Sequence, residues 1–573
     1  MTYPNRTKLV ISVFIASFVV LGFGVFNLAI IQGAKFSLLS QKNCIRVLPQ
    51  EGARGRILDR NGNPIADNYL AFDVMVSGQN KDELERALRK IAFVLEQDEQ
   101  KLRKRFRSRY ISESLPVVLD TISDNKKLIA LEQAKFDSPG IIIQPHPLRY
   151  YPYGNLACHV LGYLSQIDQW RLYKLSDYGY KPADIVGFGG AEEKYDYILR
   201  QGDGAISAEV DHVGKLVRVI GYKPAVNGGD VGLTLDIKIQ QIVQQAMQNQ
   251  KGAVIIMQPD TGEILALASF PDFDPGIFIK GSSSIEEVLN DKHSPFLNRA
   301  ISASYAPGSI FKLIVAVAGL EKKKINLGTS FICPGFLTIG RRQFKCWDTH
   351  NRQDLIQAIA GSCDVFFYHT GLALGPQLIT DYSLRFGLAK TTGIDLPYEV
   401  SGFVPSVAWK KSSRDQKWYD GDTANFSIGQ GDLLTTPIQI LRVTACFANG
   451  GFLVVPHVTK YAAGYNAGGH SGKKIKVISK QEIVNYISDG MRKAVSDPAG
   501  TASILADLPV KVSGKTGSAQ VTGSFAHGWF AGFFPSDRPK FAVCVFLENG
   551  KAGYYACLIA KEIITRMFEE GLI

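Results

Sequence analysis

Two side chains in the second half of the chain have the types and the spacing that nucleophilic catalysis requires. Ser309 and Lys312 follow a Pro-Gly pair and open an apolar run, so a hydroxyl and an amine share one face of a predicted helix. A serine becomes a good nucleophile when a base removes its proton, and a lysine is such a base only when its pKa is lowered. The same spacing recurs at residues 123–126 and 471–474, so the pair needs support from other motifs.

Two further motifs give that support. A short segment of a predicted strand consists of Lys515, Thr516, Gly517 and Ser518. Its glycine lets a substrate backbone approach closely, and its lysine would lower the pKa of Lys312 if the two lie together. The other motif places a hydroxyl on Ser362 and a carboxylate on Asp364. Each motif alone is often structural, but the three in this order favour catalysis.

A cluster of candidate metal ligands lies in the loop that leads into the Ser362 motif. Three cysteines and one histidine fall within 31 residues: Cys333, Cys346, His350 and Cys363. Three thiolates and an imidazole suit tetrahedral zinc, and a site with four protein ligands is structural. Because Cys363 lies between Ser362 and Asp364, we expect zinc loss to misplace both. The alternatives are a Cys333–Cys346 disulfide with Cys363 buried, or three unrelated thiols.

A sheet assembled from the two ends of the second half must position these motifs. Apolar runs at 252–258 and 263–269 flank a Pro-Asp-Thr-Gly turn and predict a hairpin. Three more strands are predicted at 510–520, 527–534 and 541–547, and an amphipathic helix at residues 555–569. Helical patterns and loops fill the chain between the strand groups. The predicted fold class is therefore α+β, an antiparallel sheet covered by helices.

The first half of the chain is organised differently. Residues 52–68 contain an Asp-Arg-Asn-Gly turn and predict an extended β arm. Residues 81–109 are highly charged with helical spacing of apolar positions, which predicts a solvated helical insertion. An Asn-Gly-Gly-Asp linker at 227–230 precedes an apolar strand at 231–235. We therefore place a domain boundary near residue 230.

The composition excludes several classes of protein. Of the 573 residues 46% are hydrophobic and 20% are charged, so the chain is neither disordered nor fibrous, and we expect two or three folded units. The 64 basic residues exceed the 53 acidic residues by 11, but they are scattered, so we expect anionic lipid or polymer as partners and no nucleic acid. The five ungrouped cysteines are expected to be buried or free: Cys44, Cys158, Cys446, Cys544 and Cys557.

One apolar stretch predicts membrane attachment. Residues 9–31 are 23 residues without a charge that follow Arg6 and Lys8, and a helix of this length spans a hydrocarbon core of about 30 Å. The alternatives are a cleaved signal peptide, whose apolar core is usually shorter, or a buried core helix. The positive-inside rule keeps residues 1–8 in the cytoplasm and exports the chain after about residue 32.

These motifs resemble those of the penicillin-binding proteins, specifically the class B transpeptidases, along nearly the whole chain. The matching segments of the first half are 54–68, 149–152, 159–163 and 187–193. Those of the second half are 298–299, 305–309, 421–423, 427–431 and 436–437. Asp364, where most relatives carry asparagine, and the segment 418–422 favour the elongation-specific branch, penicillin-binding protein 2, over the septal branch.

The resemblance implies an architecture and a set of partners. Residues 1–8 would be a cytoplasmic tail, 9–31 a transmembrane helix, 32–230 a β-rich pedestal of the dimerisation type and 231–573 the transpeptidase domain. The protein would cross the cell inner membrane once, with its bulk in the periplasm. Partners by resemblance are a RodA-type glycosyltransferase, an MreC-type scaffold, the D-Ala-D-Ala stem peptide and β-lactams.

The resemblance also implies roles for the three motifs. Ser309 would attack the penultimate D-alanine of a stem peptide and release the terminal D-alanine, and an amine of a neighbouring strand would then take up the acyl group. Lys312 would be the base, and protons would be relayed by Ser362, Asp364 and Lys515. The segment Thr516, Gly517 and Ser518 would bind the substrate backbone, with an oxyanion hole made by the N–H groups of Ser309 and Ser518. Similar ligand positions in some elongation-type relatives favour zinc at the cysteine cluster.

The predicted function is peptidoglycan D,D-transpeptidation during cell elongation, which maintains cell shape, with a carboxypeptidase side activity left open. Three alternatives remain at this point. They are a septal class B transpeptidase, a β-lactam sensor or hydrolase with the same Ser-x-x-Lys chemistry, and a non-catalytic scaffold.

Overall fold

The computed structural model describes residues 3–37, 45–76, 81–110, 116–182, 184–210, 216–280, 284–463, 474–521 and 525–573. The chain forms two compact units. The first comprises Met1–Arg54, Asn68–Leu148 and Gln201–Gly228, and the second comprises Gly55–Asp67, Arg149–Arg200 and Gly229–Ile573. Because the chain passes between the units more than once, the domain boundaries read along the sequence stay a prediction. Cys44 and residues 471–473 lie outside the described residues.

The apolar stretch near the N-terminus is helical. Helix α1 (Tyr3–Phe26) continues into a π-helical turn, η1 (Asn27–Ile31). Residues Thr7–Ile31 are long and apolar enough to cross a membrane, and none of their most apolar window is buried in the protein. An apolar helix of a soluble core would be covered by its neighbours. The exposure therefore argues against the core-helix alternative.

The rest of the first unit contains two sheets and three helices. One sheet has the order β1-β8-β9, formed by β1 (Ile45–Gln50), β8 (Gly204–Val210) and β9 (Leu216–Lys223). In the other, β3 (Pro64–Val76) pairs with β4 (Val117–Ile122) and β5 (Ile141–Tyr150). The helices are α3 (Lys81–Leu95), α4 (Glu99–Arg109) and α5 (Asn125–Asp137). Leu88, Ile91 and Leu102 of α3 and α4 pack on Val74 and Leu119, so the predicted helical insertion is confirmed as two helices.

Five strands form the sheet that carries the Lys515 motif. They are β11 (Gly252–Met257), β12 (Ile264–Phe270), β20 (Ser513–Ala519), β21 (His527–Phe534) and β22 (Phe541–Leu547). Their order is β12-β11-β22-β21-β20, and every neighbouring pair is antiparallel. All five predicted strands are present, although β20 begins at Ser513 and not at residue 510. The Lys515 motif thus lies on an edge strand.

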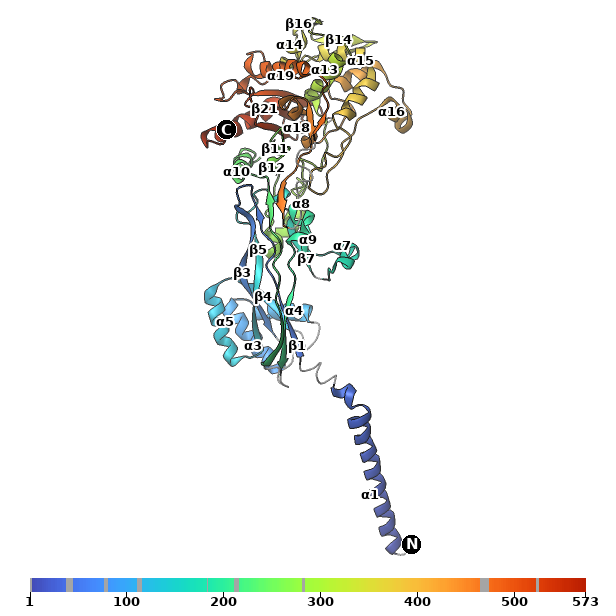
Figure 1. Ribbon diagram of the computed structural model, residues 1–573, viewed down its shortest axis with the longest axis vertical. Coiled ribbons are helices and arrows are strands. Elements are labelled where there is room, and N and C mark those ends of the chain that lie inside the picture. Colours follow the sequence, from blue (N-terminus) through green and yellow to red (C-terminus); the bar gives the residue numbers. More distant parts are fainter. Residues whose placement is uncertain are drawn as a thin grey trace. The chain divides into compact units, whose positions relative to one another are not determined.

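Helices cover both faces of this sheet (Figure 1). Val254 and Ile256 of β11 face a core shared with α10 (Ile237–Ala246) and α20 (Gly553–Glu569). Ala253 and Ile255 face the opposite core, which contains α13 (Lys312–Glu321) and α18 (Pro437–Ala448). Burial on both faces explains why the strands read as continuous apolar runs. The predicted α+β class is confirmed.

The segment between the strand groups is mainly helical, as predicted. Its further helices are α11 (Ile277–Lys280), α12 (Ser284–Leu289), α14 (Leu355–Ala360), α15 (Asp364–Arg385), α16 (Val407–Arg414) and α17 (Asp420–Ser427), and α19 (Gln481–Ser496) follows α18. Two small ribbons were not predicted. They are formed by β13 (Phe331–Cys333) with β16 (Asn351–Gln353), and by β14 (Phe336–Ile339) with β15 (Arg342–Lys345). Strands of three or four partly exposed residues have no apolar run that would reveal them.

Shorter elements complete the second unit. Its remaining strands are β2 (Ile57–Leu58), β6 (Tyr163–Gln166), β7 (Ile185–Phe188), β10 (Val231–Leu233), β17 (Phe452–Val454), β18 (Thr459–Ala462) and β19 (Lys474–Lys476). Its remaining helices are α6 (Cys158–Leu161), α7 (Gln169–Leu175), α8 (Gly190–Lys194) and α9 (Asp196–Leu199). Ile57 of β2 pairs with Ala66 of β3, which confirms the predicted β arm. A buried ion pair links two resemblance segments, because Arg149 Nε donates to Glu192 Oε1 at 2.9 Å.

Candidate active site

Ser309 lies on a tight turn beside the edge of the five-stranded sheet. It belongs to a 3-10 turn, η3 (Gly308–Phe311), which runs directly into α13. Gly308 has a φ of 57°, and its N–H donates to the Gly429 carbonyl at 3.0 Å. A Cβ on Gly308 would lie 2.8 Å from the Ser518 carbonyl oxygen. The glycine before Ser309 is therefore needed for both conformation and space, and it brings the serine next to the Lys515 motif.

Lys312 is fully buried and joins two of the motifs. Its Nζ donates to Asp364 Oδ1 at 2.7 Å, to the Ser362 carbonyl at 2.8 Å and to Ser362 Oγ at 3.2 Å. These three acceptors match the three N–H donors of an ammonium group. Within the described chain no hydrogen bond joins Ser309 to Lys312. Catalytic hydrogen bonds are often long in the absence of substrate.

The backbone around Ser362 is held in an unusual conformation. Ser362 has a φ of 55° and is 5% exposed. It lies between the end of α14 and Asp364, which opens α15. A non-glycine residue with positive φ is strained and persists only where its surroundings fix it. The helix N-terminus also favours the negative charge of Asp364.

Lys515 lies on β20 with its side chain completely buried. Its Nζ donates to the Thr516 carbonyl at 3.1 Å. Burial, followed by the charge of Lys312, holds the pKa of Lys515 well below its usual value. The lowered pKa favours the neutral form of the Lys515 amine, which the sequence did not predict.

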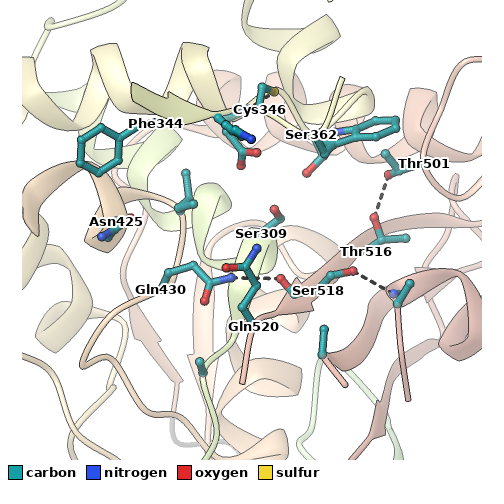
Figure 2. Close-up of a pocket in the computed structure, with 18 of the residues that line it drawn as sticks. Ser309, Phe344, Cys346, Ser362, Asn425, Gln430, Thr501, Thr516, Ser518 and Gln520 are labelled. Carbon is teal, nitrogen blue, oxygen red and sulfur yellow. Dashed lines mark hydrogen bonds between the residues drawn. The ribbon is translucent and has the colours of Figure 1, made fainter. Parts of the chain in front are cut away.

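The outer residues of the β20 motif are fixed by bonds from other segments, which Figure 2 shows as dashed lines. Thr516 Oγ1 donates to Thr501 Oγ1 at 2.8 Å, and Ser518 Oγ accepts from the Gly553 N–H at 3.0 Å. The Ser518 carbonyl accepts from Gln430 Nε2 at 3.1 Å. Thr501 could not be found from the sequence because it follows α19 in an irregular segment with no motif of its own.

A pocket of about 1150 Å³ opens over these groups. In Figure 2, Ser309 lies between the Ser362 loop and the Thr516–Ser518 strand. The pocket is lined on further sides by Phe344, Cys346 and Trp347 of the ribbon region, and by Asn425 and Gln520. The three predicted catalytic motifs thus meet at one pocket. The similarly spaced pair at residues 123–126 lies outside it.

The four predicted metal ligands also lie together. The ligand atoms of Cys333, Cys346, His350 and Cys363 are all within 4.8 Å of one another. His350 Nδ1 is 3.6 Å from the Cys333 sulfur and 3.5 Å from the Cys346 sulfur. The three cysteines are free thiols, and the structure contains no Cys333–Cys346 disulfide. Four N and S donors at this separation fit the tetrahedral geometry of zinc.

The surroundings of the cluster also fit a metal site. His350 Nε2 lies 3.0 Å from the Gly361 carbonyl, which directs Nδ1 toward the three sulfurs. A shared hydrogen bond with Cys363 lowers the pKa of Cys346 and raises the pKa of Cys363. The Asp364 N–H donates to the Cys346 sulfur at 3.2 Å. The cluster therefore contacts the backbone of Asp364, one of the predicted catalytic residues, directly.

Four described cysteines take no part in the cysteine–histidine cluster. Cys158, Cys446, Cys544 and Cys557 are buried free thiols, and burial raises the pKa of each. None belongs to a metal-ligand group among the described residues. The expectation of buried free thiols is confirmed for these four.

Comparison with known proteins agrees with this geometry. Residues 252–569 match the penicillin-binding protein transpeptidase domain, and residues 49–233 match the penicillin-binding protein dimerisation domain. The peptidoglycan D,D-transpeptidase MrdA of Acinetobacter baumannii is 31% identical over 98% of this chain and 87% of its own length.

Solved structures show the same architecture. A Helicobacter pylori complex between penicillin-binding protein PBP2 and MreC aligns with a TM-score of 0.82 at 27% identity, covering 92% of this chain and 99% of that one. A chain of a peptidoglycan synthase complex that coordinates polymerization and crosslinking aligns with a TM-score of 0.74 at 28% identity, covering 98% and 97%. With its serine motifs assembled at one pocket, the chain belongs to the elongation-type class B penicillin-binding proteins and is a serine-type peptidoglycan D,D-transpeptidase.

Proposed function

We propose that Ser309 is the nucleophile of this transpeptidase and that Lys312, Ser362, Asp364 and Lys515 handle its proton. The observation that carries the proposal is the set of hydrogen bonds of Lys312, which follows Ser309 by one turn and whose Nζ donates to both Ser362 and Asp364. We propose that the proton of Ser309 Oγ passes through this group of side chains to the amine of Lys515, whose lowered pKa favours its neutral form.

The acylation step transfers one acyl group. Ser309 Oγ attacks the carbonyl carbon of the penultimate D-alanine and loses its proton to this relay. The bond to the nitrogen of the terminal D-alanine then breaks, and the relay returns the proton to that nitrogen. An acceptor amine reverses the sequence and forms the cross-link. The N–H groups of Ser309 and Ser518 are proposed to stabilise the oxyanion, and Thr516 and Gly517 to bind the substrate backbone.

A β-lactam that mimics the donor is expected to acylate the same oxygen. Labelling of the full chain with a fluorescent penicillin tests the proposal, with Ser309→Ala as the variant and Ser412→Ala, an exposed serine of α16, as the matched control. We expect labelling of wild type and control and none of Ser309→Ala. Labelling that persists in Ser309→Ala would overturn the assignment, and no labelling of wild type would favour a non-catalytic scaffold.

We also propose that Cys333, Cys346, His350 and Cys363 hold a structural zinc ion. Zinc would supply four bonds that tie the ribbons to the start of α15. The support is the mutual distance of the four ligand atoms. Elemental analysis of purified protein is expected to give about one zinc per chain and much less for Cys346→Ser. Metal-free protein with Cys333 and Cys346 linked by a disulfide would contradict the proposal.

We propose partners from the solved relatives and a membrane orientation from the charges that precede the apolar helix. We propose an MreC-type scaffold and a RodA-type glycosyltransferase as partners, supported by the PBP2–MreC complex and the peptidoglycan synthase complex. We further propose that residues 9–31 of the apolar helix cross the inner membrane, with residues 1–8 in the cytoplasm and the chain after about residue 32 in the periplasm. Protease added to spheroplasts is expected to digest the chain after residue 32, and its protection would contradict this orientation.

A further inference from the structure

The strongest unexplained feature of the second unit is a polar pocket beside α10. Seven of the eleven residues from 240 to 250 are glutamine or asparagine. Exposed helix positions in globular proteins commonly carry charged residues, which are soluble and good helix formers. A surface of neutral amides at this density therefore calls for another explanation.

Two of these amides serve the fold. Gln240 exchanges two hydrogen bonds with the backbone of Leu267 on β12. Gln244 donates to Asp272 Oδ2 at 2.6 Å and to the Asn155 carbonyl at 3.0 Å. Both side chains are buried. They anchor α10 to the sheet edge and to the turn at residues 153–156.

Three other amide side chains do not anchor α10 to the fold. Gln241, Gln245 and Gln248 recur at helical spacing on one side of α10 and its end, and their side chains make no hydrogen bond within the described chain. They line a pocket of about 880 Å³ together with Tyr153, Asn155, Asp272 and His293. We call this space the glutamine pocket. Its amides can each donate and accept, which suits a ligand rich in hydroxyl and acetamido groups.

The charges of the pocket disfavour an anionic ligand. Lys251 at its wall is paired with Glu548 at 2.9 Å. The carboxylate of Asp272 lies among the amides and accepts from Asn155 Nδ2 at 2.9 Å. Tyr153 is 39% exposed and presents an aromatic ring. A carboxylate, several amides and an aromatic face suit a neutral ligand that combines hydroxyl groups with apolar ring faces.

The glutamine pocket lies at the same end of the sheet as Ser309. One register row crosses all five strands, from Phe270 through Gly252, Leu547 and Gly528 to Ser518. Phe270 lines the glutamine pocket, and Ser518 lines the active-site pocket. Four strand spacings separate them by about 19 Å. Because the strands occupy the direct line, an extended peptide that follows this end of the sheet needs at least about six residues.

We propose that the glutamine pocket binds the saccharide backbone of peptidoglycan, a chain of neutral N-acetylated sugars, while an attached peptide extends toward Ser309. The choice of this polymer rests on the transpeptidase function. The binding itself rests on the amides of α10 and on Asp272 and Tyr153. The pocket would align a glycan strand with the sheet edge and so favour peptides presented by polymer over free peptides.

Calorimetric titration of the full chain in detergent with chitotetraose, a neutral N-acetylglucosamine oligomer, tests the proposal. We expect saturable binding that the double variant Gln245→Ala and Gln248→Ala weakens about tenfold, because two amide hydrogen-bond partners are lost. The matched control removes two exposed glutamines elsewhere, Gln377→Ala and Gln481→Ala. It should bind like wild type, and an oligogalacturonate of equal length should not bind.

Two outcomes would overturn the proposal: no saturable binding of chitotetraose to wild type, or equal affinity of wild type and the α10 double variant. Fluorescent penicillin labelling separates this result from the catalytic assignment. Labelling should be unchanged in the α10 double variant, since neither glutamine lines the active-site pocket. Ser309→Ala should lose labelling and keep chitotetraose binding.

Discussion

The two regions that meet at Ser362 and Asp364 are positioned by different physical means. Lys312 and Lys515 are 0% exposed and lie on elements packed into a sheet with helices on both faces. Three of the four residues of the cysteine–histidine cluster lie in or beside ribbons whose strands have three or four residues, where Trp347 is 59% exposed, and Cys363 precedes α15. Burial of apolar surface positions the first region, which we call the core-packed region. Short ribbons bury too little surface to be stable alone, so we propose that the second region, which we call the ligand-held region, depends on zinc bound by its four ligands.

The two regions supply different residues of the active-site pocket. The core-packed side supplies Ser309, Lys312 and the β20 strand, and the ligand-held side supplies Ser362 and Asp364 with the Phe344 wall. Lys312 is bonded to both members of the second side. A change in the cysteine–histidine cluster should therefore lower the acylation rate without unfolding the sheet.

The largest expected effect comes from the link between the regions. Lys312→Ala removes all three bonds to Ser362 and Asp364, and we expect the rate of penicillin acylation to fall about 1000-fold. Stopped-flow measurement with a fluorescent penicillin gives this rate. The control is Lys322→Ala, an exposed lysine just after α13, which should leave the rate unchanged. A fall of less than tenfold for Lys312→Ala would remove it from the proton relay.

A change in the ligand-held region should act locally. Cys333→Ser removes one ligand, and we expect an acylation rate about 100-fold lower because Ser362 and Asp364 shift. Hydrogen exchange should rise across residues 331–353 and stay unchanged in β20–β22. Cys446→Ala, a buried thiol outside the cluster, is the control and should alter neither. Faster exchange throughout the sheet would show that the two regions are not separately stabilised.

A change in the core-packed region should act through close contact. A Cβ on Gly517 would lie 2.8 Å from the Pro307 carbonyl oxygen, on the turn that carries Ser309. We expect Gly517→Ala to slow acylation about tenfold, since such overpacking costs about 1–3 kcal/mol. Gly221→Ala on β9, where the nearest atom lies 3.8 Å away, is the control. Zinc content should not change, and its loss in Gly517→Ala would contradict the separation of the regions.

The smallest effect concerns the free energy of unfolding. Burial and the charge of Lys312 lower the pKa of Lys515 from its ordinary value of 10.5. Between this lowered pKa and pH 10.5 the unfolded chain binds more protons than the folded chain, so this group destabilises the fold, and the destabilisation shrinks as the pH rises through this range. Lys515→Met should unfold at a higher temperature than wild type at pH 7, by a margin that shrinks toward pH 10. A difference in unfolding temperature that grows with pH would contradict a lowered pKa for Lys515.

The sequence was informative where the physical signal is local or rare. Strands buried on both faces are continuous apolar runs, so β11, β12, β21 and β22 were predictable almost to the residue. The cysteine–histidine cluster was predictable because such residues are rarely grouped. The spacing of Ser309 and Lys312 became meaningful only with the other two motifs.

Features that depend on contacts between distant segments were not predictable. The bond from Thr501 to Thr516 and the contact of Gly429 with Gly308 join segments brought together only by the fold. The strong lowering of the pKa of Lys515 was not predicted for the same reason, because the burial of Lys515 and its closeness to Lys312 arise only in the fold.

The proposed dependence of catalysis on zinc is tested most directly by the acylation rate of wild-type protein as zinc is removed and restored. Zinc per chain and the rate constant for fluorescent penicillin would be measured on the same samples. The account predicts that the rate falls about 100-fold as zinc is lost, while the far-ultraviolet circular dichroism of the sheet and helices persists, and that added zinc restores it. Metal-free protein that acylates at the wild-type rate would contradict it.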